Sequence, residues 1–307
     1  NATVSDQDIL MIGNDALQAI TKRCLDAVIN DGLCDNEYAM EFLARMSLNG
    51  LQHEILFSTP CRDFFMNAFL GVSRQGANSN FTSWLLEYLG GFIRYLGAEK
   101  QFDALLAWQK IFIETLQSAE HLAGSILQLL SVIEGYIVSI SPGAIAISPY
   151  LIAADFWKEP ALYYGSCRLI SSIFQKNGSA NLFANGGSQL LEISKVLMSN
   201  KPSEHVGYYF LENCIPFMIQ SNDFESITTV FTLIFSRLTS NRTLKRILDT
   251  TRLISVAIIS SQNLGALVTL LQRIEFIQAG LFKMIIQSLY STCSQSSSEI
   301  DKKLHTI

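Results

Sequence analysis

The sequence SEHVGYYFLENCIPFMIQSNDFESITTVFTLIFSRL, residues 203–238, gives the clearest structural signal in the chain. Its second part carries large apolar residues at steps of three and four, which places them on one face of a helix: Phe224, Ile227, Phe231, Ile234 and Leu238. Its first part, residues 203–219, has two such stripes: Val206, Phe210, Cys214 and Phe217, and Tyr208, Leu211, Ile215 and Met218. A helix that is apolar on almost every side has to be covered by several neighbours.

Local signals place the ends of these helices. Asn222 is expected to cap the helix at 223–238, with Glu225 three residues further on. Gly97 is expected to close a helix at 81–97. Pro216 should bend the helix at 203–219, because proline removes a backbone hydrogen bond and clashes with the preceding turn.

Helical spacing recurs along the whole chain, and strand-like alternation over more than five residues is essentially absent. Helices are predicted near 6–29, 37–49, 61–75, 81–97, 101–117, 121–139, 147–156, 160–177, 186–199, 203–219, 223–238, 242–260, 262–272 and 277–293. The helices that begin a pair start near 81, 121, 160, 203 and 242, at intervals of about 40, 39, 43 and 39 residues. Helix pairs at about 40–47 residues are typical of HEAT and armadillo repeats.

The predicted fold is therefore all-α, a HEAT-repeat α-solenoid in which antiparallel helix pairs form a right-handed superhelix. Residues 1–293 are expected to form a single continuous array, the C-terminal fragment of a longer protein. Residues 294–307 are expected to form a polar tail, frayed or truncated. An irregular helical bundle is the alternative.

The composition is strongly apolar. Hydrophobic residues make up 49% of the 307 residues and charged residues 16%, against about 25% charged in typical soluble domains. Two stretches, 135–154 and 253–272, lack any formal charge, but prolines interrupt the first and the sequence SSQN interrupts the second. No membrane insertion is therefore expected. The six cysteines are scattered, which favours a reducing compartment.

The net charge of −5 is unevenly distributed. Residues 1–155 carry 8 Lys and Arg against 17 Asp and Glu, whereas residues 156–307 carry 14 against 10. A nucleic-acid-binding protein would need a concentrated basic face, so no nucleic-acid partner is expected. The distribution fits a chain that binds protein surfaces of both signs.

The sequence contains no recognisable reactive constellation. Its four histidines, at 53, 121, 205 and 305, are far apart and have no cysteine or paired carboxylate at ligand spacing. Phosphate-binding glycine loops and the nucleophile pattern G-x-S-x-G are absent. We therefore predict no catalytic, cofactor or metal site, and a protein that is not an enzyme.

Basic residues gather at the end of the helix that closes at Leu238 and in the turn and helix after it: Arg237, Arg242, Lys245, Arg246 and Arg252. A solvated outer face is one interpretation, and a docking patch for an acidic surface is the other. Arg242, Lys245 and Arg246 are spaced to share one face of a helix. Partner binding is therefore predicted for Arg237, Arg242, Lys245 and Arg246, whereas the aromatic residues Trp108, Tyr163 and Tyr164 are expected to line the core or a groove.

Several stretches resemble a known family. They are DNEYAMEFLARM (35–46), DFWKEPALYYGSCRLISSIF (155–174), KPSEHVGYYFLENCIPFM (201–218), VFTLIFSRLTSNRTLKRIL (230–248) and AGLFKMIIQSLYS (279–291). In this order they are similar to the C-terminal region of the CAS (cellular apoptosis susceptibility) family, nuclear export receptors for importin-α in the importin-β superfamily.

The resemblance implies a HEAT-repeat receptor that binds importin-α together with Ran in its GTP form. It also implies contact with nuclear pore proteins, shuttling between nucleus and cytoplasm, a monomeric state, and no cofactor on this chain, since the GTP is carried by Ran. The family has no short binding motif from which contact residues can be transferred. A different karyopherin or an assembly platform built of helical repeats is the alternative.

Overall fold

The computed structural model describes residues 14–30, 37–50, 53–75, 79–176, 179, 187–199, 201–241 and 243–261, with a few single positions between 265 and 287. Apart from those positions, the helices predicted near 262–272 and 277–293 and the tail predicted at 294–307 lie outside the described residues. The chain divides into two compact units, Asn1–Gly143 and Ala144–Ile307. The described residues contain helices and no β-strand.

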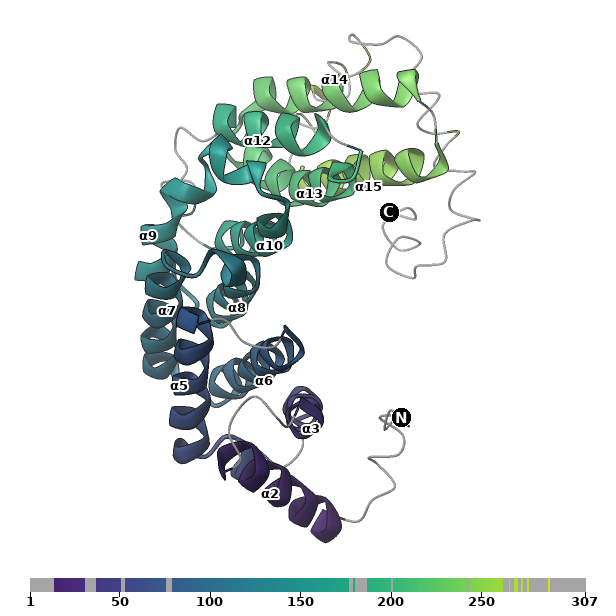
Figure 1. The fold of residues 1–307 in the computed structure, drawn as a ribbon. Coiled ribbons are helices and arrows are strands. Elements are labelled where there is room, and N and C mark those ends of the chain that lie inside the picture. The colour runs from purple at the N-terminus through teal and green to yellow at the C-terminus, as the bar shows by residue number, and fades with distance from the viewer. Residues whose placement is uncertain are drawn as a thin grey trace. The chain divides into compact units, whose positions relative to one another are not determined.

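The first unit consists of two layers of helices. Its helices are α2 (Asn14–Asn30), α3 (Glu37–Leu48), α4 (His53–Leu56), α5 (Thr59–Gln75), α6 (Ser79–Ala98), α7 (Phe102–Leu116), the 3-10 helix η1 (Glu120–Leu122) and α8 (Ala123–Tyr136). In one layer α3 contacts α6, and α6 contacts α8. In the other layer α5 packs on α6, and α7 packs on both α6 and α8 (Figure 1).

An aromatic cluster joins the two layers of the first unit. The ring centroids of Phe92 on α6 and Trp108 on α7 lie 5.1 Å apart, and those of Phe69 on α5 and Phe112 on α7 are also 5.1 Å apart. All four side chains are buried. The expected core position of Trp108 is therefore confirmed, and the edge-to-face rings pack in a geometry that aromatic pairs favour.

The second unit repeats the arrangement. Its helices are α9 (Pro142–Leu151, whose first two residues belong to the first unit), the 3-10 helices η2 (Ala154–Lys158) and η3 (Pro160–Leu162), α10 (Tyr163–Phe174), α12 (Gly187–Ser199), α13 (Glu204–Gln220), α14 (Phe224–Ser240) and α15 (Leu244–Ser260). In one layer α10 contacts α13, and α13 contacts α15. Helices α12 and α14 form the other layer and both pack on α13 (Figure 1).

The layer helices recur at an interval of 40 to 44 residues, close to the predicted one. In the first unit they begin at Glu37, Ser79 and Ala123, which are 42 and 44 residues apart. In the second they begin at Tyr163, Glu204 and Leu244, which are 41 and 40 residues apart. Side-chain bonds between neighbouring layer helices show the same separation, 43 residues for Asn80–Glu37 and 42 for Ser171–Asn213. Each sequence repeat of 40 to 44 residues therefore adds one helix to this layer.

Helix α13 explains why residues 203–219 are apolar on almost every side. It contacts α10 and α15 within its own layer and α12 and α14 in the other layer. Every member of the two predicted stripes is buried. The helix has neighbours on several sides, so an amphipathic pattern would have placed polar groups in the core.

The predicted cap at Asn222 is wrong by one residue. The carboxylate of Asp223 accepts a hydrogen bond from the Ser226 backbone N–H at 3.1 Å and caps α14. Asn222 instead ends α13 in a left-handed conformation, with a φ of 57°. The N–H of Asp223 then donates to the carbonyl of Met218 at 2.9 Å, which satisfies a carbonyl at the helix end.

The prolines do not break the segment 142–151 as predicted. Pro142 is the first residue of α9, where a missing N–H costs nothing. Pro149 lies inside α9 and cannot donate to the carbonyl of Ile145. The hydroxyl of Ser148 donates to that carbonyl at 3.0 Å and replaces the lost bond. The helix predicted at 147–156 is therefore divided between α9 and η2, and the bend predicted at Pro216 stays a prediction.

Gly97 does not end α6 as predicted. The left-handed position is taken by Lys100, with a φ of 56°, while the N–H of Gln101 donates to the carbonyl of Leu96 at 2.8 Å. Gly97 lies inside α6, where a Cβ atom would come 2.3 Å from Cγ of Tyr136 on α8. The glycine therefore serves the close approach of two layer helices.

Replacement of Gly97 by alanine is expected to lower the free energy of unfolding of the first unit by about 2 kcal/mol, because the ring of Tyr136 has to move out of its packed position. Chemical denaturation followed by circular dichroism measures the loss. Gly90→Ala in the same helix is the matched control, since the nearest atom to its Cβ is 3.6 Å away. Equal stability of the two variants would contradict this role of Gly97.

Candidate functional site

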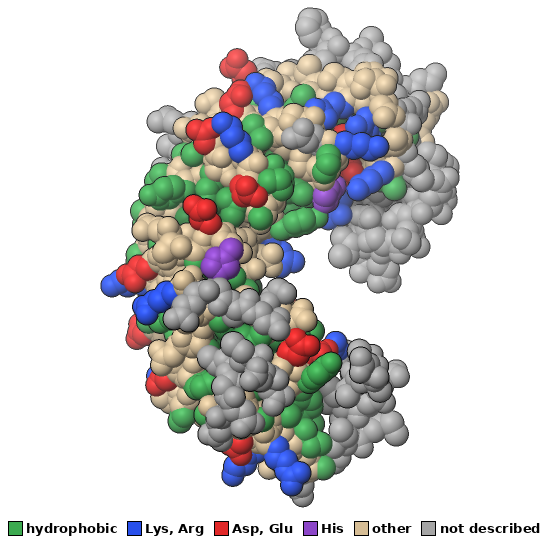
Figure 2. Space-filling model, viewed as in Figure 1, with side chains coloured by type: hydrophobic (Ala, Val, Ile, Leu, Met, Phe, Trp, Pro, Cys, Tyr) green, Lys and Arg blue, Asp and Glu red, His purple; other side chains and the backbone are tan. Residues whose placement is uncertain are grey.

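The basic residues predicted to bind a partner lie where α14 leads into α15. Arg237 is in the last turn of α14, and Lys245 and Arg246 are in the first turn of α15. The helix begins at Leu244, so Arg242 precedes it, and Arg242 itself lies outside the described residues. Figure 2 shows Lys and Arg side chains gathered over α13 to α15.

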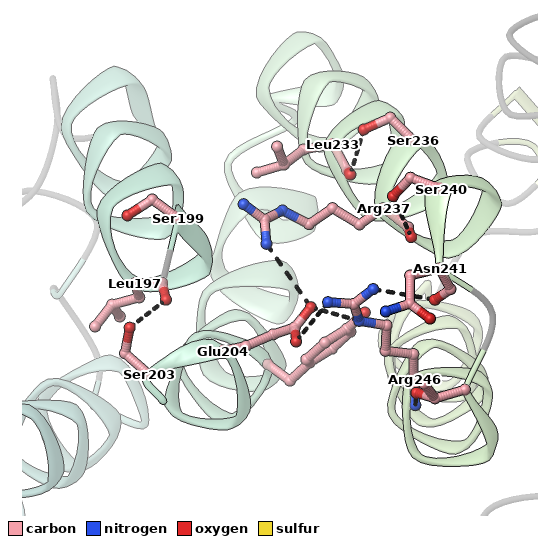
Figure 3. Close-up of polar contacts among 12 residues, drawn as sticks. Leu197, Ser199, Ser203, Glu204, Leu233, Ser236, Arg237, Ser240, Asn241 and Arg246 are labelled. Atoms are coloured by element: carbon pink, nitrogen blue, oxygen red, sulfur yellow. Dashed lines mark hydrogen bonds and ion pairs between the residues drawn. The ribbon is translucent and has the colours of Figure 1, made fainter. Parts of the chain in front are cut away.

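A buried glutamate on α13 organises this region (Figure 3). Glu204 is the first residue of α13, and its side chain is only 11% exposed. The guanidinium of Arg246 approaches it with both arms, Nε at 2.8 Å from Oε1 and Nη2 at 2.9 Å from Oε2. The two residues are 42 positions apart, one step of the repeat. A two-armed contact of this kind is the strongest form of ion pair between side chains.

Two further contacts hold the Arg246 side chain and its helix. Nη1 of Arg246 donates to the carbonyl of Asn241 at 3.0 Å, and the hydroxyl of Thr243 accepts from the Arg246 backbone N–H at 3.3 Å as the cap of α15. Arg237 is more loosely placed, with Nη1 3.8 Å from Oε1 of Glu204. The hydrogen bond to Glu204 raises the pKa of Arg246. Arg246 therefore joins α13, the α14–α15 turn and α15 inside the protein.

The four predicted residues thus occupy different environments. Arg246 and Arg237 face Glu204, whereas the Lys245 side chain is exposed on α15. Glu204 was not among the predicted site residues, although its distance of 42 positions from Arg246 equals the repeat interval. That spacing was the one available signal for the pair.

The same layer carries other polar links between neighbouring helices. Nε of Arg252 on α15 lies 2.9 Å from Oε1 of Glu212 on α13. Between α10 and α13, the Tyr164 hydroxyl is hydrogen-bonded to Nε2 of His205, and Tyr164 is 50% exposed. Burial raises the pKa of Asp249, while Lys245 and Arg252 lower it. The solvent-exposed side of α10, α13 and α15 is therefore a polar surface cross-linked between neighbouring helices.

Two aromatic residues from the similar stretches are core residues. Trp157 is fully buried, its indole N–H donates to the carbonyl of Leu151 at 2.8 Å, and its ring centroid lies 5.2 Å from that of Phe210 on α13. Tyr163 is buried beside it, with centroids 6.4 Å apart. The expected core position is confirmed for Tyr163, whereas Tyr164 is 50% exposed and is not a core residue.

No described helix combines the length and the apolar composition needed to span a bilayer. The described part of the chain contains no group of three or more His, Cys, Asp or Glu side chains arranged to hold a metal ion.

Comparison with known families identifies the chain. The family model described as "CAS/CSE protein, C-terminus" matches residues 4–307. The chain belongs to the CAS/CSE protein family. The CAS/CSE resemblance that the sequence stretches suggested is therefore confirmed.

Curated relatives of this CAS/CSE chain are named Exportin-2. The protein from Danio rerio is 25% identical over 285 residues, and the protein from Homo sapiens is 25% identical over 284 residues. In both cases the match covers 89% of this chain and 28% of the relative. The chain thus spans less than a third of the length of these exportins.

A solved structure, "The exportin Cse1 in its cargo-free, cytoplasmic state", has the same fold, with a TM-score of 0.73 and 18% identity. The match covers 94% of this chain and 31% of that one. The fold of the CAS/CSE chain is the predicted all-α, HEAT-repeat α-solenoid, as the two-layer units and the repeat interval also indicate.

Proposed function

We propose that this chain is the C-terminal part of a nuclear export receptor that carries importin-α out of the nucleus in a complex with Ran-GTP. The observation that carries the proposal is the family match over residues 4–307 together with relatives named as exportins. In this proposal the chain shuttles between nucleus and cytoplasm as a monomer and contacts nuclear pore proteins. It binds no nucleic acid and is not an enzyme, because GTP hydrolysis belongs to Ran.

The physical mechanism is the flexibility of stacked repeats. In an array over residues 1–293, each repeat contacts only its neighbours, so small changes at successive interfaces add up to a large change of curvature. Partners that bind only the wrapped state offset the free energy of bending, and their release restores the relaxed state. Cross-links between neighbouring repeats, such as Glu204–Arg246, hold the stack together while its curvature changes.

The proposal is tested with the full-length parent protein and purified importin-α and Ran. We expect the parent to capture both proteins when Ran carries a non-hydrolysable GTP analogue, and to release both when Ran carries GDP. Equal capture of importin-α with the GTP analogue and with GDP would instead favour a different helical-repeat scaffold. No capture of importin-α in either state would reject the assignment.

Partner binding stays a proposal for Arg237, Arg242, Lys245 and Arg246. The substitution that tests it best changes a residue that has no contact with the buried Glu204. Substitution of Arg237 or Arg246 disturbs the buried Glu204, so a loss of binding there would be confounded by a loss of stability. Lys245 is exposed and avoids this problem.

Lys245→Glu in the full-length parent is expected to weaken capture of importin-α and Ran-GTP about five-fold, because a charge that faces an acidic partner is reversed. Titration at physiological salt measures the dissociation constant. Lys110→Glu on α7 makes the same charge change at an exposed position of the first unit. If both variants bind as tightly as the unmodified protein, Lys245 does not contact the partner.

A further inference from the structure

The solvent-exposed side of α3 and α6 in the first unit carries two rows of polar and aromatic residues. Glu37, Glu41 and Arg45 follow one another at steps of four on α3, so they share one side of the helix. Asn80, Trp84 and Glu87, at steps of four and three, likewise share one side of α6. The Asn80 amide donates to Oε2 of Glu37 at 3.2 Å and sets the two rows side by side.

The surface already binds one cationic group of its own chain, the guanidinium of Arg45. Its Nη2 lies 2.9 Å from Oε1 of Glu41, and its Nε donates to the same oxygen at 3.1 Å. Its Cζ lies 5.7 Å from the centroid of the Trp84 ring. One guanidinium is thus already held between a carboxylate and an aromatic ring, the two groups that attract a cation most strongly in proteins.

The surface keeps an excess of negative charge and exposed aromatic area. Glu37, Glu41 and Glu87 outnumber the single cation Arg45, and Tyr38, next to Glu37, is 68% exposed. Partial burial raises the pKa of Glu87, Arg45 lowers it, and the like charge of Glu41 raises it. Residues 1–143 as a whole carry 16 Asp and Glu against 8 Lys and Arg, so the field of the unit attracts cations.

We propose that this surface, the Trp84 face (Glu37, Tyr38, Glu41, Trp84 and Glu87), binds a basic, extended segment of a partner protein. Arg or Lys side chains of the segment pair with Glu37 and Glu87, and their stems and charged groups lie against Tyr38 and Trp84. Phosphate-bearing partners are excluded by the three carboxylates. This goes beyond the proposed function, because the partner has the opposite charge to one that Lys245 would bind, and the two surfaces lie in different units.

The experiment uses the full-length parent and a fluorescent peptide of alternating Arg and Gly. Fluorescence anisotropy at physiological salt gives the dissociation constant for the peptide. Glu37→Gln and Glu87→Gln are each expected to raise it about five-fold, since each removes one exposed ion pair. Tyr38→Ala is expected to raise it about three-fold through loss of the aromatic contact.

Asp63→Asn on α5 is the matched control, because it removes one exposed negative charge from the other layer of the same unit. The proposal predicts that this variant binds as the unmodified protein does, and that a peptide with Glu in place of Arg does not bind. Equal weakening by Asp63→Asn would show a diffuse charge effect and overturn the proposal. Unchanged binding in the Glu37 and Glu87 variants, or no binding to the unmodified protein, would overturn it too. Capture of importin-α and Ran-GTP is measured in parallel, so a failure of the export function is recognised separately.

Discussion

Replacement of Glu204 by methionine is expected to lower the free energy of unfolding of the second unit by about 4 kcal/mol. The change leaves the guanidinium of Arg246, whose side chain is only 15% exposed, without its carboxylate. It also leaves Arg246 and Arg237 close together without a negative charge between them. An uncompensated charge in a poorly hydrated site costs far more than an exposed ion pair contributes.

Urea unfolding followed by tryptophan fluorescence measures this loss. Trp157 is the only tryptophan of residues 144–307, so a background with Trp84→Phe and Trp108→Phe reports on the second unit alone. Glu192→Met is the matched control, because Glu192 forms an exposed pair with Lys195 at 2.6 Å within α12. We expect this control to cost less than about 1 kcal/mol.

The companion variant Glu204→Met/Arg246→Met is expected to recover part of the loss, since apolar side chains of similar size replace the pair. The importance of the buried charge would be disproved if Glu204→Met cost no more than Glu192→Met. A double variant less stable than Glu204→Met would show that the arginine acts mainly through its contact with Asn241.

Replacement of Trp157 by alanine is expected to destabilise the second unit by about 4 kcal/mol, because a fully buried indole is removed and its neighbours cannot fill the space. The ring packs against Phe210 on α13, and the N–H satisfies the carbonyl that ends α9 at Leu151. Trp157→Phe keeps most of the apolar area but leaves that carbonyl without its donor, so we expect a smaller loss of about 2 kcal/mol.

Urea unfolding followed by circular dichroism compares these variants with Phe156→Ala. Phe156 is the adjacent residue in η2 but is only half-buried, so its removal should cost less than about 2 kcal/mol. If Trp157→Ala and Phe156→Ala were equally stable, Trp157 would not anchor η2 to α13.

Apolar periodicity predicted the fold well, because it is a local property of each helix. The stripes at residues 203–219 indicated burial on several sides, and α13 is enclosed by four helices of its unit. The interval of about 40 residues indicated stacked repeats, and the layer helices begin at that interval in both units. These features depend on 3.6-residue spacing and chain length alone.

Errors occurred where a residue had two possible local roles. Asn222 has the chemistry of an N-cap and of a left-handed C-terminal residue, and the choice depended on Asp223 being available as the cap. Gly97 was assigned to a helix end, whereas its role is contact with Tyr136, some forty residues away in the sequence. Pro149 was assigned as a break, but Ser148 supplies the missing hydrogen bond.

The sequence by itself determined that this chain is helical, that it repeats at about 40 residues, and that it resembles the CAS/CSE family. Only the tertiary structure decided which charges are available at the surface. Arg246 and Lys245 are neighbours with similar side chains, yet one faces the buried Glu204 and the other faces solvent. The reason is physical: apolar faces are set by spacing within one helix, whereas a charge pair between repeats depends on the lateral register of two helices some forty residues apart in the sequence.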